Sequence, residues 1–202
     1  MVEPAGPVTT RVVAERLGVS AASATNMLKR LDALGLVAHE HYKGAELTES
    51  GRKIALEVIR HHRLLETYLA EAMGVPWDRV HEEAEVLEHV LSEDLEDRIA
   101  ELLGHPEFDP HGHPIPAKDG TMPSASDRRL WDVGDGASVS VDRVSDHESA
   151  GLRYLANAGI RPGTKLEVVG RGPLEGPLFV RVDGRNDDVA LSRELAEAVW
   201  VA

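Results

Sequence analysis

Apolar residues recur at helical spacing twice within the first 35 residues, and a short polar turn separates the two runs. The first helix is predicted over residues 9–17 and the second over residues 21–34. Ser20 is a typical N-cap for the second helix, and Gly35 follows its last apolar position as a terminator. Two helices joined by a tight turn in this way predict a helix-turn-helix.

Two short runs of alternating apolar and polar residues follow over residues 36–48, on either side of Lys43-Gly44. They predict a β-hairpin, the wing of a winged helix. A helix-turn-helix places the start of its second helix in the major groove of DNA. Such shapes also serve as plain packing modules, but the hairpin after this one favours DNA binding. We therefore predict a winged-helix domain over residues 1–52, with double-stranded DNA as its partner.

Helical patterns continue over residues 49–69, 76–91 and 92–103. Leucines such as Leu64 supply either a core or a dimer face along these helices. A helical domain is therefore predicted over residues 53–116, with a homodimer as the expected assembly.

The stretch over residues 105–136 is rich in turn residues and has almost no apolar periodicity. It indicates a linker, which we place at residues 117–132. His111 and His113 resemble a pair of metal ligands, yet Pro and Gly alternate with them. We interpret both histidines as loop residues, with metal binding as the less favoured alternative.

Short strands divided by glycine turns characterise the rest of the chain, and one helix over residues 150–158 interrupts them. The predicted strands cover residues 137–144, 165–169, 178–182 and 198–201. This pattern is typical of a small β-barrel, here over residues 133–202. The predicted fold class is thus α+β: an N-terminal winged helix, a helical domain and a C-terminal barrel. The barrel contains no sequence of catalytic type.

The run from Val80 to His89 places two imidazoles and two carboxylates on one stripe of a predicted α-helix. At about 100° per residue, His81, Glu85, Glu88 and His89 fall within a sector of roughly 100°. Neutral imidazole nitrogens and carboxylate oxygens are the ligands that a borderline-to-hard divalent cation prefers. The stripe therefore predicts a metal site, and its place after a helix-turn-helix indicates a sensor.

A second polar pair, His62 and Glu66, lies at i, i+4 in an otherwise apolar helix. Two helices carrying these ligand patterns could face each other and form one or two cation sites. The binding forms are neutral His and ionised Glu, so affinity should fall as the pH drops. Any one of these histidines taken alone is more typical of a surface or core residue; the combined spacing favours ligands.

Charge is unevenly distributed along this chain of 202 residues, whose net charge is −13. Residues 1–60 carry 8 Lys/Arg and 7 Asp/Glu, whereas residues 61–110 carry 3 and 14. A solvated acidic face explains most of these carboxylates, and the four residues of the stripe favour metal instead.

The chain has no cysteine, so any metal must be held by nitrogen and oxygen. The absence of a signal peptide and of a run of about 20 apolar residues predicts a cytoplasmic protein with no membrane partner.

These features together resemble the diphtheria toxin repressor and manganese transport regulator family of metal-dependent transcriptional repressors. The resemblance covers nearly the whole chain. It rests on the winged helix, on His62-Arg63-Leu64-Leu65-Glu66, on residues 80–92, on residues 109–116 and on a barrel that resembles an SH3-like (FeoA-like) domain. The middle segments are specific, because unrelated winged-helix proteins lack them.

The resemblance implies two metal sites. Glu85, Glu88 and His89 would belong to the primary, activating site. His62, Glu66 and His81 would belong to an ancillary site, to which the barrel can add a ligand. Glu148 falls near that point, with Asp146 as a substitute.

The resemblance also implies how the protein meets its operator. Lys29 lies with other polar residues on the outer faces of the second helix, where lysine contacts phosphates. The remaining implied DNA contacts are Ser20, Ala22, Ser23, Thr25 and Asn26, with Thr9, Thr10 and Lys43 at the backbone. Metal would order the dimer on a palindromic operator of metal-homeostasis genes.

Two departures from the family pattern matter. Iron-sensing members tend to carry Cys where this chain has Glu85, and a carboxylate shifts preference toward Mn²⁺, with Fe²⁺ as the alternative. Family members also begin with a helix that supplies a ligand to the primary site. This chain starts near the end of that helix, with Val2-Glu3-Pro4 as its expected tail, so we favour a start codon assigned too late over a primary site that lacks one arm.

Three other functions are consistent with parts of the sequence. A winged-helix regulator could sense an organic effector, with the His/Glu stripe merely solvated. A metallohydrolase would need a general base and a substrate cleft, which nothing beyond the ligands indicates. A protein-binding barrel is permitted by the short strands, but aromatic residues make up only 4% of the chain and no aromatic groove is evident. The metal-dependent repressor is preferred, and catalysis is not expected.

Overall fold

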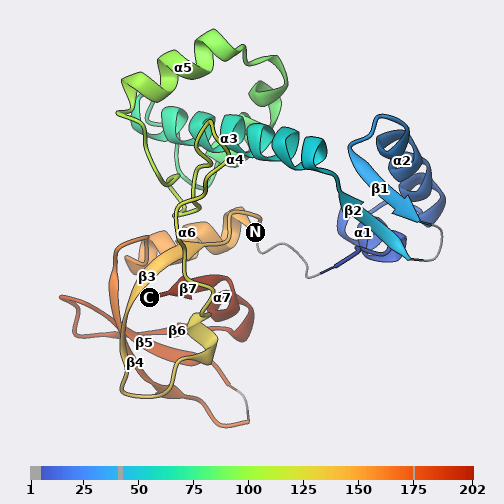
Figure 1. Cartoon of the computed structure of the whole chain (residues 1–202). Coiled ribbons are helices and arrows are strands. Elements are labelled where there is room, and N and C mark those ends of the chain that lie inside the picture. Colours follow the sequence, from blue (N-terminus) through green and yellow to red (C-terminus); the bar gives the residue numbers. More distant parts are fainter. Residues whose placement is uncertain (1–5, 41–42, 175) are drawn as a thin grey trace. The chain divides into compact units, whose positions relative to one another are not determined.

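The computed structural model describes residues 6–40, 43–174 and 176–202, and the chain divides into two compact units, residues 1–58 and 59–202 (Figure 1). The expected tail of an N-terminal helix, Val2 to Pro4, lies outside the described residues. So do His41 and Tyr42 at the tip of the predicted hairpin.

The first unit is a winged helix, as predicted. Helix α1 (Thr10–Leu17) is capped by the Thr9 hydroxyl, and α2 (Ala21–Ala33) is capped by the Ser20 hydroxyl, which accepts the Ser23 N–H at 3.1 Å. Strands β1 (Val37–Glu40) and β2 (Gly44–Leu47) form the antiparallel wing. The tight turn between the helices uses Gly18 at φ 62°, a left-handed conformation that favours glycine.

Helix α3 (Glu49–Glu71) begins in the first unit and continues into the second, where α4 (Val80–Leu87) and α5 (Glu93–Leu102) complete the helical part. Its core consists of Leu64, Leu65, Leu69, Val80, Ala84, Ile99, Ala100 and Ile115. The prediction of one α-helix over residues 76–91 is wrong. The α-helix ends at Leu87, and Glu88–Val90 form a 3₁₀ turn, η1. A 3₁₀ turn advances about 120° per residue, so the spacing of about 100° per residue that defined the predicted stripe does not hold for Glu88 and His89.

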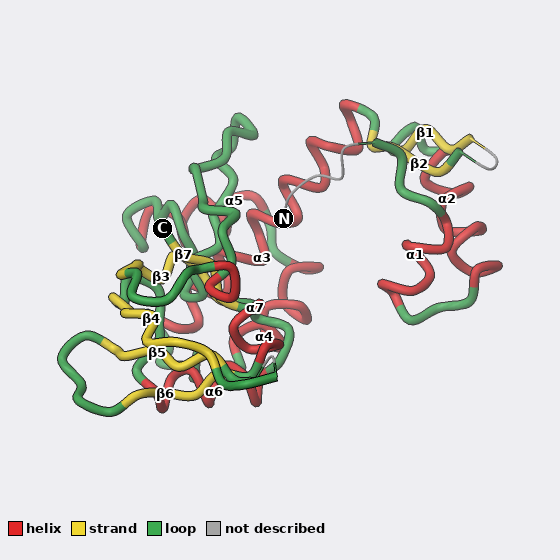
Figure 2. The backbone as a smooth tube through the Cα atoms, turned by 90° about the horizontal axis from the view of Figure 1, so that it is seen from below, coloured by secondary structure: helices red, strands yellow, loops and turns green. Residues whose placement is uncertain are grey.

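The C-terminal part is an SH3-like domain with a five-stranded antiparallel sheet in the order β6-β5-β4-β3-β7, open rather than closed. Its elements are β3 (Ser138–Val144), α6 (Ser149–Ala158), β4 (Lys165–Arg171), β5 (Leu178–Val182), β6 (Asp188–Leu191), α7 (Arg193–Glu197) and β7 (Val199–Val201). Strand β6 and helix α7 escaped prediction. Figure 2 shows the strands gathered together with α6 beside β6, where the Tyr154 hydroxyl donates to the Ala190 carbonyl at 2.7 Å.

Part of the predicted linker is built into this domain. The Val201 N–H donates to the Arg128 carbonyl at 2.9 Å, and the 3₁₀ turn η2 (Leu130–Asp132) buries Leu130 and Trp131 in the core of the sheet domain. Packing of the C-terminal domain therefore begins before residue 133. Of the helices that the structure describes, none is long and apolar enough to span a membrane.

Candidate metal centre

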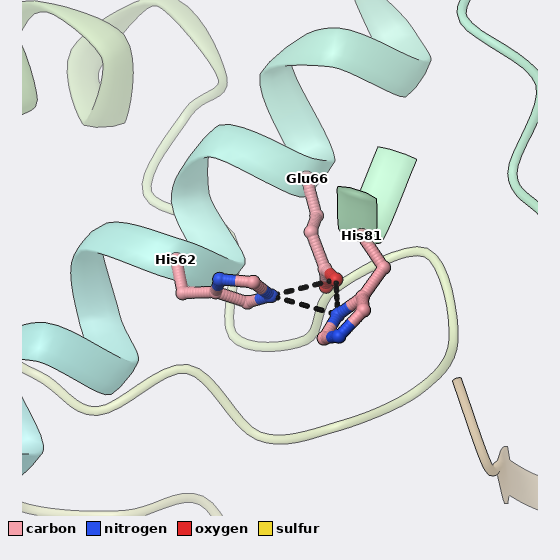
Figure 3. Close-up of side chains that lie close together, drawn as sticks. All are labelled: His62, Glu66 and His81. Atoms are coloured by element: carbon pink, nitrogen blue, oxygen red, sulfur yellow. Dashed lines mark hydrogen bonds and ion pairs between the residues drawn. The ribbon is translucent and has the colours of Figure 1, made fainter. Parts of the chain in front are cut away.

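Helices α3 and α4 bring His62, Glu66 and His81 together (Figure 3). His62 and Glu66 are one turn apart on α3, and His81 lies in the first turn of α4. Glu66 Oε1 is 3.0 Å from both His62 Nε2 and His81 Nδ1, and these two nitrogens are 2.9 Å apart. A single proton can serve only one donor–acceptor pair of such a triangle, whereas a cation lying to one side of its plane can bind all three atoms.

The other carboxylate oxygen of Glu66 faces a second group. Glu66 Oε2 lies 3.6 Å from His111 Nδ1, and one ligand atom each from Glu66, His111 and Asp146 falls within 4.8 Å of the others. Glu66 Oε2 and His111 Nδ1 are buried without a hydrogen-bond partner among the described residues. A buried polar atom without a partner is costly. These two atoms therefore fit a ligand that supplies positive charge.

Electrostatics couples these residues tightly. Burial by itself would raise the pKa of Glu66, but the neighbouring imidazoles of His111, His62 and His81 outweigh it and hold that pKa well below its usual range. Burial lowers the pKa of His62, and its bonds to Glu66 and Glu88 raise it to about 9.

The other two histidines respond in the same direction. The bond to Glu66 raises the pKa of His81 against burial. Burial also opposes the charge on His111, yet Glu66, Asp109 and the Trp77 carbonyl raise its pKa to about 9. In the metal-free protein, protons thus sit on the nitrogens that would bind a cation, and metal must displace them.

The alternation of Pro and Gly with His111 and His113 favours loop roles for both histidines, with metal binding as the less favoured alternative. The glycine has another role. Gly112 adopts φ +88°, and a Cβ there would lie 2.2 Å from the Asp142 carbonyl oxygen, so only glycine lets the loop lie this close to β3. The Val144 N–H of β3 donates to the His111 carbonyl at 2.9 Å. The loop is held against the sheet, and His111 is fully buried beside Glu66.

His113 and Asp109 extend the cluster on its other side. Asp109 Oδ1 accepts the N–H groups of His111 and His113 at 2.8 and 2.9 Å. Asp109 Oδ2 lies 3.3 Å from His113 Nδ1, and both atoms are buried without a hydrogen-bond partner among the described residues. The sequence pattern of this loop does not reveal that these side chains are buried, and their burial is what makes them candidate ligands.

The predicted stripe is not gathered into one site. Glu88 turns inward, with Oε2 2.7 Å from His62 Nδ1. His89 is 74% exposed, with Nδ1 3.4 Å from Glu88 Oε1, and Glu85 is exposed with no hydrogen bond or ion pair to another described residue. His81 joins Glu66 instead. The inward residues His81 and Glu88 both contact His62, whereas Glu85 and His89 face outward.

The C-terminal domain supplies Asp146 to the cluster. Its Oδ2 is 3.8 Å from both His81 Nδ1 and His113 Nδ1. Glu148 is exposed at the N-cap position of α6, and within the described ranges it makes no polar contact with the cluster. Of the two acids that the sequence offered, the structure therefore brings Asp146 to the other candidate ligands.

The candidate DNA contacts lie on the winged helix as expected, but several already have internal bonds. The Thr9 and Ser20 hydroxyls cap helices, and Thr25 Oγ1 donates to the Ala21 carbonyl at 2.8 Å. Lys43 Nζ lies 2.6 Å from Glu40. Exposed positions of α2 are Ala22, Ser23, Asn26 and Lys29, and Thr10 is half-buried at the start of α1. Among these, Asn26 and Lys29 present long polar groups to an outside partner.

A winged helix followed by a buried cluster of imidazoles and carboxylates defines a class: a DNA-binding protein with a metal centre of nitrogen and oxygen donors. Three family models match consecutive parts of the chain. The iron dependent repressor N-terminal DNA binding domain matches residues 2–45, its metal binding and dimerisation domain matches residues 48–117, and the FeoA domain matches residues 128–202.

Two repressors are similar to this chain over most of its length. The iron-dependent repressor IdeR of Mycobacterium tuberculosis is 33% identical over 201 residues, covering 94% of this chain and 86% of that protein. The diphtheria toxin repressor of Corynebacterium diphtheriae is 30% identical over 199 residues, with 94% and 86% covered.

Solved structures are similar as well. A manganese-dependent transcriptional repressor in complex with manganese superposes with a TM-score of 0.90 at 43% identity, covering 98% of this chain and 92% of that one. ScaR with bound Cd²⁺ has a TM-score of 0.82 at 30% identity, with 98% and 92% covered. The chain belongs to the diphtheria toxin repressor family of metal-dependent, DNA-binding transcriptional repressors, which are not enzymes.

Proposed function

We propose that this repressor binds Mn²⁺, with Fe²⁺ as the alternative, at two neighbouring positions, and that binding prepares a homodimer for a palindromic operator of metal-homeostasis genes. The observation that carries the proposal is the pair of buried, unpartnered atoms Glu66 Oε2 and His111 Nδ1, aimed at one another across 3.6 Å. In the metal-free protein a proton on His111 supplies the positive charge that Glu66 Oε2 faces, and a dication can take the place of that proton.

The inner position would be held by Glu66, His81, His111 and Asp146. The outer position would be held by His62 and Glu88, with Glu85 and His89, which are exposed in the metal-free chain, as further ligands. The distances among Glu66, His111 and Asp146 support the first set, and the 2.7 Å contact between His62 and Glu88 supports the second. A bound dication supplies the positive charge that now comes from protons on the histidines.

The donor set supports manganese. It consists of imidazoles and carboxylates, and the chain has no cysteine, so the harder cations of the first transition row are favoured. The manganese-dependent repressor is 43% identical to this chain and the iron-dependent repressor of M. tuberculosis 33%. Intrinsic affinity rises from Mn²⁺ to Fe²⁺, so cellular supply and coordination geometry would decide the cation in use.

The inner position joins two parts of the second unit. Glu66 comes from α3, His81 from α4, and Asp146 follows β3 of the C-terminal domain. We propose that this domain completes the inner position. A cation held more tightly by the DNA-ready arrangement shifts the population toward it, by no more than that difference in affinity.

An apolar surface on α3, η1 and α5 is the proposed dimer interface. A groove of about 320 Å³ lies there, lined among others by Leu65, Tyr68, Met73, Val90 and Leu102. Met73, Val90 and Leu102 are 62, 78 and 68% exposed. The proposed occupant is a second copy of this chain, because the family model matched to this segment is a dimerisation domain. Burial of such a patch in a dimer removes apolar area from water.

Operator binding against metal concentration tests the proposal. Electrophoretic mobility shifts on a palindromic operator should appear with Mn²⁺, disappear with a chelator and return when Mn²⁺ is restored. His111→Ala should abolish the inner phase of Mn²⁺ binding, and His39→Ala, which alters a wing histidine outside the centre, is the matched control. Equal DNA affinity with and without Mn²⁺ would refute the switch.

A further inference from the structure

Trp77 lies in the loop between α3 and α4, yet it packs with the C-terminal domain. It is 7% exposed and belongs to the hydrophobic cluster of that domain, with Leu130 and Leu152, rather than to the core of the helices. Its neighbour Asp78 pairs with Arg153 of α6, Oδ2 to a guanidinium nitrogen at 3.2 Å. The loop around Trp77 therefore connects the helical part with the C-terminal domain.

Trp77 holds His111 in two ways. The Trp77 carbonyl accepts a hydrogen bond from His111 Nε2 at 2.7 Å, and the two rings are stacked with centroids 5.5 Å apart and planes inclined by 28°. A proton committed to Nε2 leaves Nδ1 as the nitrogen whose lone pair is offered to a cation. Nδ1 is the buried atom that faces Glu66. The contact with Trp77 thus decides which nitrogen of His111 points into the inner position.

The indole also reaches the C-terminal domain directly. The Arg161 guanidinium carbon lies 4.3 Å from the centre of the indole, a distance typical of a cation–π interaction. The His111 carbonyl accepts the Val144 N–H from β3. Trp77 and His111 therefore form one packed layer between α3 and the sheet domain.

We propose that Trp77 is a positioning residue for the inner cation position, and that it couples occupancy of that position to docking of the C-terminal domain. The inference rests on the proposed function, since it requires His111 to bind a cation. Coupling of this kind is reciprocal. A docked domain raises the affinity of the inner position for Mn²⁺, and Mn²⁺ at that position tightens the docking.

The simpler alternative is that Trp77 only fills space in a core. Trp131 provides a matched control, because it is 9% exposed, packs in the same core and has Arg171 over its ring at 4.4 Å. Within the described residues, Trp131 makes no hydrogen bond or ring contact with His111 or Glu66. If core filling were the whole role of Trp77, the two tryptophans would have equal effects on metal binding.

Calorimetric titration of the full chain with Mn²⁺ distinguishes a positioning role of Trp77 from core filling. The inner phase is the Mn²⁺-binding step that His111→Ala removes, and the outer phase is the step that remains. Trp77→Leu removes the stacked indole and its contact with Arg161 but keeps the backbone carbonyl that accepts from His111 Nε2, so it should weaken the inner phase several-fold. It should leave the outer phase within about 2-fold of wild type. Trp77→Phe retains a stacking ring, so it should restore most of the affinity. Trp131→Leu should leave both phases unchanged.

Arg161→Met keeps Trp77 and removes only the guanidinium over its ring. This variant therefore tests the inference even if Trp77→Leu fails to fold. It should weaken the inner phase several-fold, and small-angle scattering should show Mn²⁺-induced compaction of wild type that is reduced in this variant. An unchanged inner phase in both Trp77→Leu and Arg161→Met would overturn the inference. Equal losses in Trp77→Leu and Trp131→Leu would overturn it too. A wild-type protein that binds no Mn²⁺ would instead refute the proposed function.

Discussion

The stability of the metal-free protein should fall as the pH rises from about 6.5 to 9. His62 and His111 each have a pKa of about 9 in the folded chain, against an ordinary value of 6.5. A raised pKa means that the fold stabilises the protonated imidazole. This stabilisation is complete below the unfolded pKa of 6.5 and is lost as the pH passes through 9.

The magnitude follows from the size of the shifts. One pKa unit corresponds to about 1.4 kcal/mol, so each histidine contributes up to about 3 kcal/mol. Both interact with the same carboxylate, Glu66, so their contributions do not simply add. We expect the free energy of unfolding to decrease by about 3–5 kcal/mol in total between pH 6.5 and 9.

Urea unfolding in a chelator at pH 6.5, 7.5 and 9 measures this change. His62→Ala should remove a large share of the pH dependence, whereas His89→Ala, at a position 74% exposed, should leave it intact. With saturating Mn²⁺ the trend should reverse, because metal competes with the same protons and binds more tightly as the pH rises. A metal-free stability that stays level or increases from pH 6.5 to 9 would refute the reasoning.

Three further outcomes are expected. Asn26→Ala should weaken operator binding by about 1–3 kcal/mol in mobility shifts with Mn²⁺ present, and its affinity for Mn²⁺ should not change. An equal loss of Mn²⁺ affinity would contradict a role at the DNA interface. Val90→Asp should convert the dimer to a monomer in sedimentation experiments with little change in unfolding, because Val90 is 78% exposed; a persistent dimer would exclude this surface. Gly112→Ala should lower the free energy of unfolding in urea by about 2–3 kcal/mol and weaken the inner phase of Mn²⁺ binding, because a Cβ there would lie 2.2 Å from the Asp142 carbonyl oxygen. A variant as stable as wild type would contradict this expectation, because it would show that the loop can shift.

Local rules were sufficient for the winged helix. Ser20 and Thr9 cap their helices through bonds to N–H groups only three residues away, and Gly18 and Gly35 adopt the left-handed backbone that ends each helix. These interactions lie within single turns, so residue type and spacing predict them. Family resemblance in the middle segments added the function.

Secondary structure was harder to predict where apolar pattern and tertiary packing compete. The pattern over residues 76–91 is helical throughout, yet the α-helix ends at Leu87. There Glu88 turns inward to His62 on α3. Strand β6 is only four residues long and gains its register from β5. His62 lies 26 residues from Glu88, so that contact could not be read from a local window. Strand β6 does follow β5 closely, but four residues are too few to show a clear alternating pattern.

The sequence by itself determined the chemistry of the candidate metal centre, which is imidazoles and carboxylates with no thiolate, and the family resemblance grouped His62, Glu66 and His81 in an ancillary site. Only the tertiary structure decided that His111 and Asp146 join them while Glu85 and His89 face outward. The physical reason is burial. Packing of the 109–113 loop against β3 removes His111 and Glu66 from water. An exposed imidazole or carboxylate is solvated, whereas a buried one needs an opposite charge beside it.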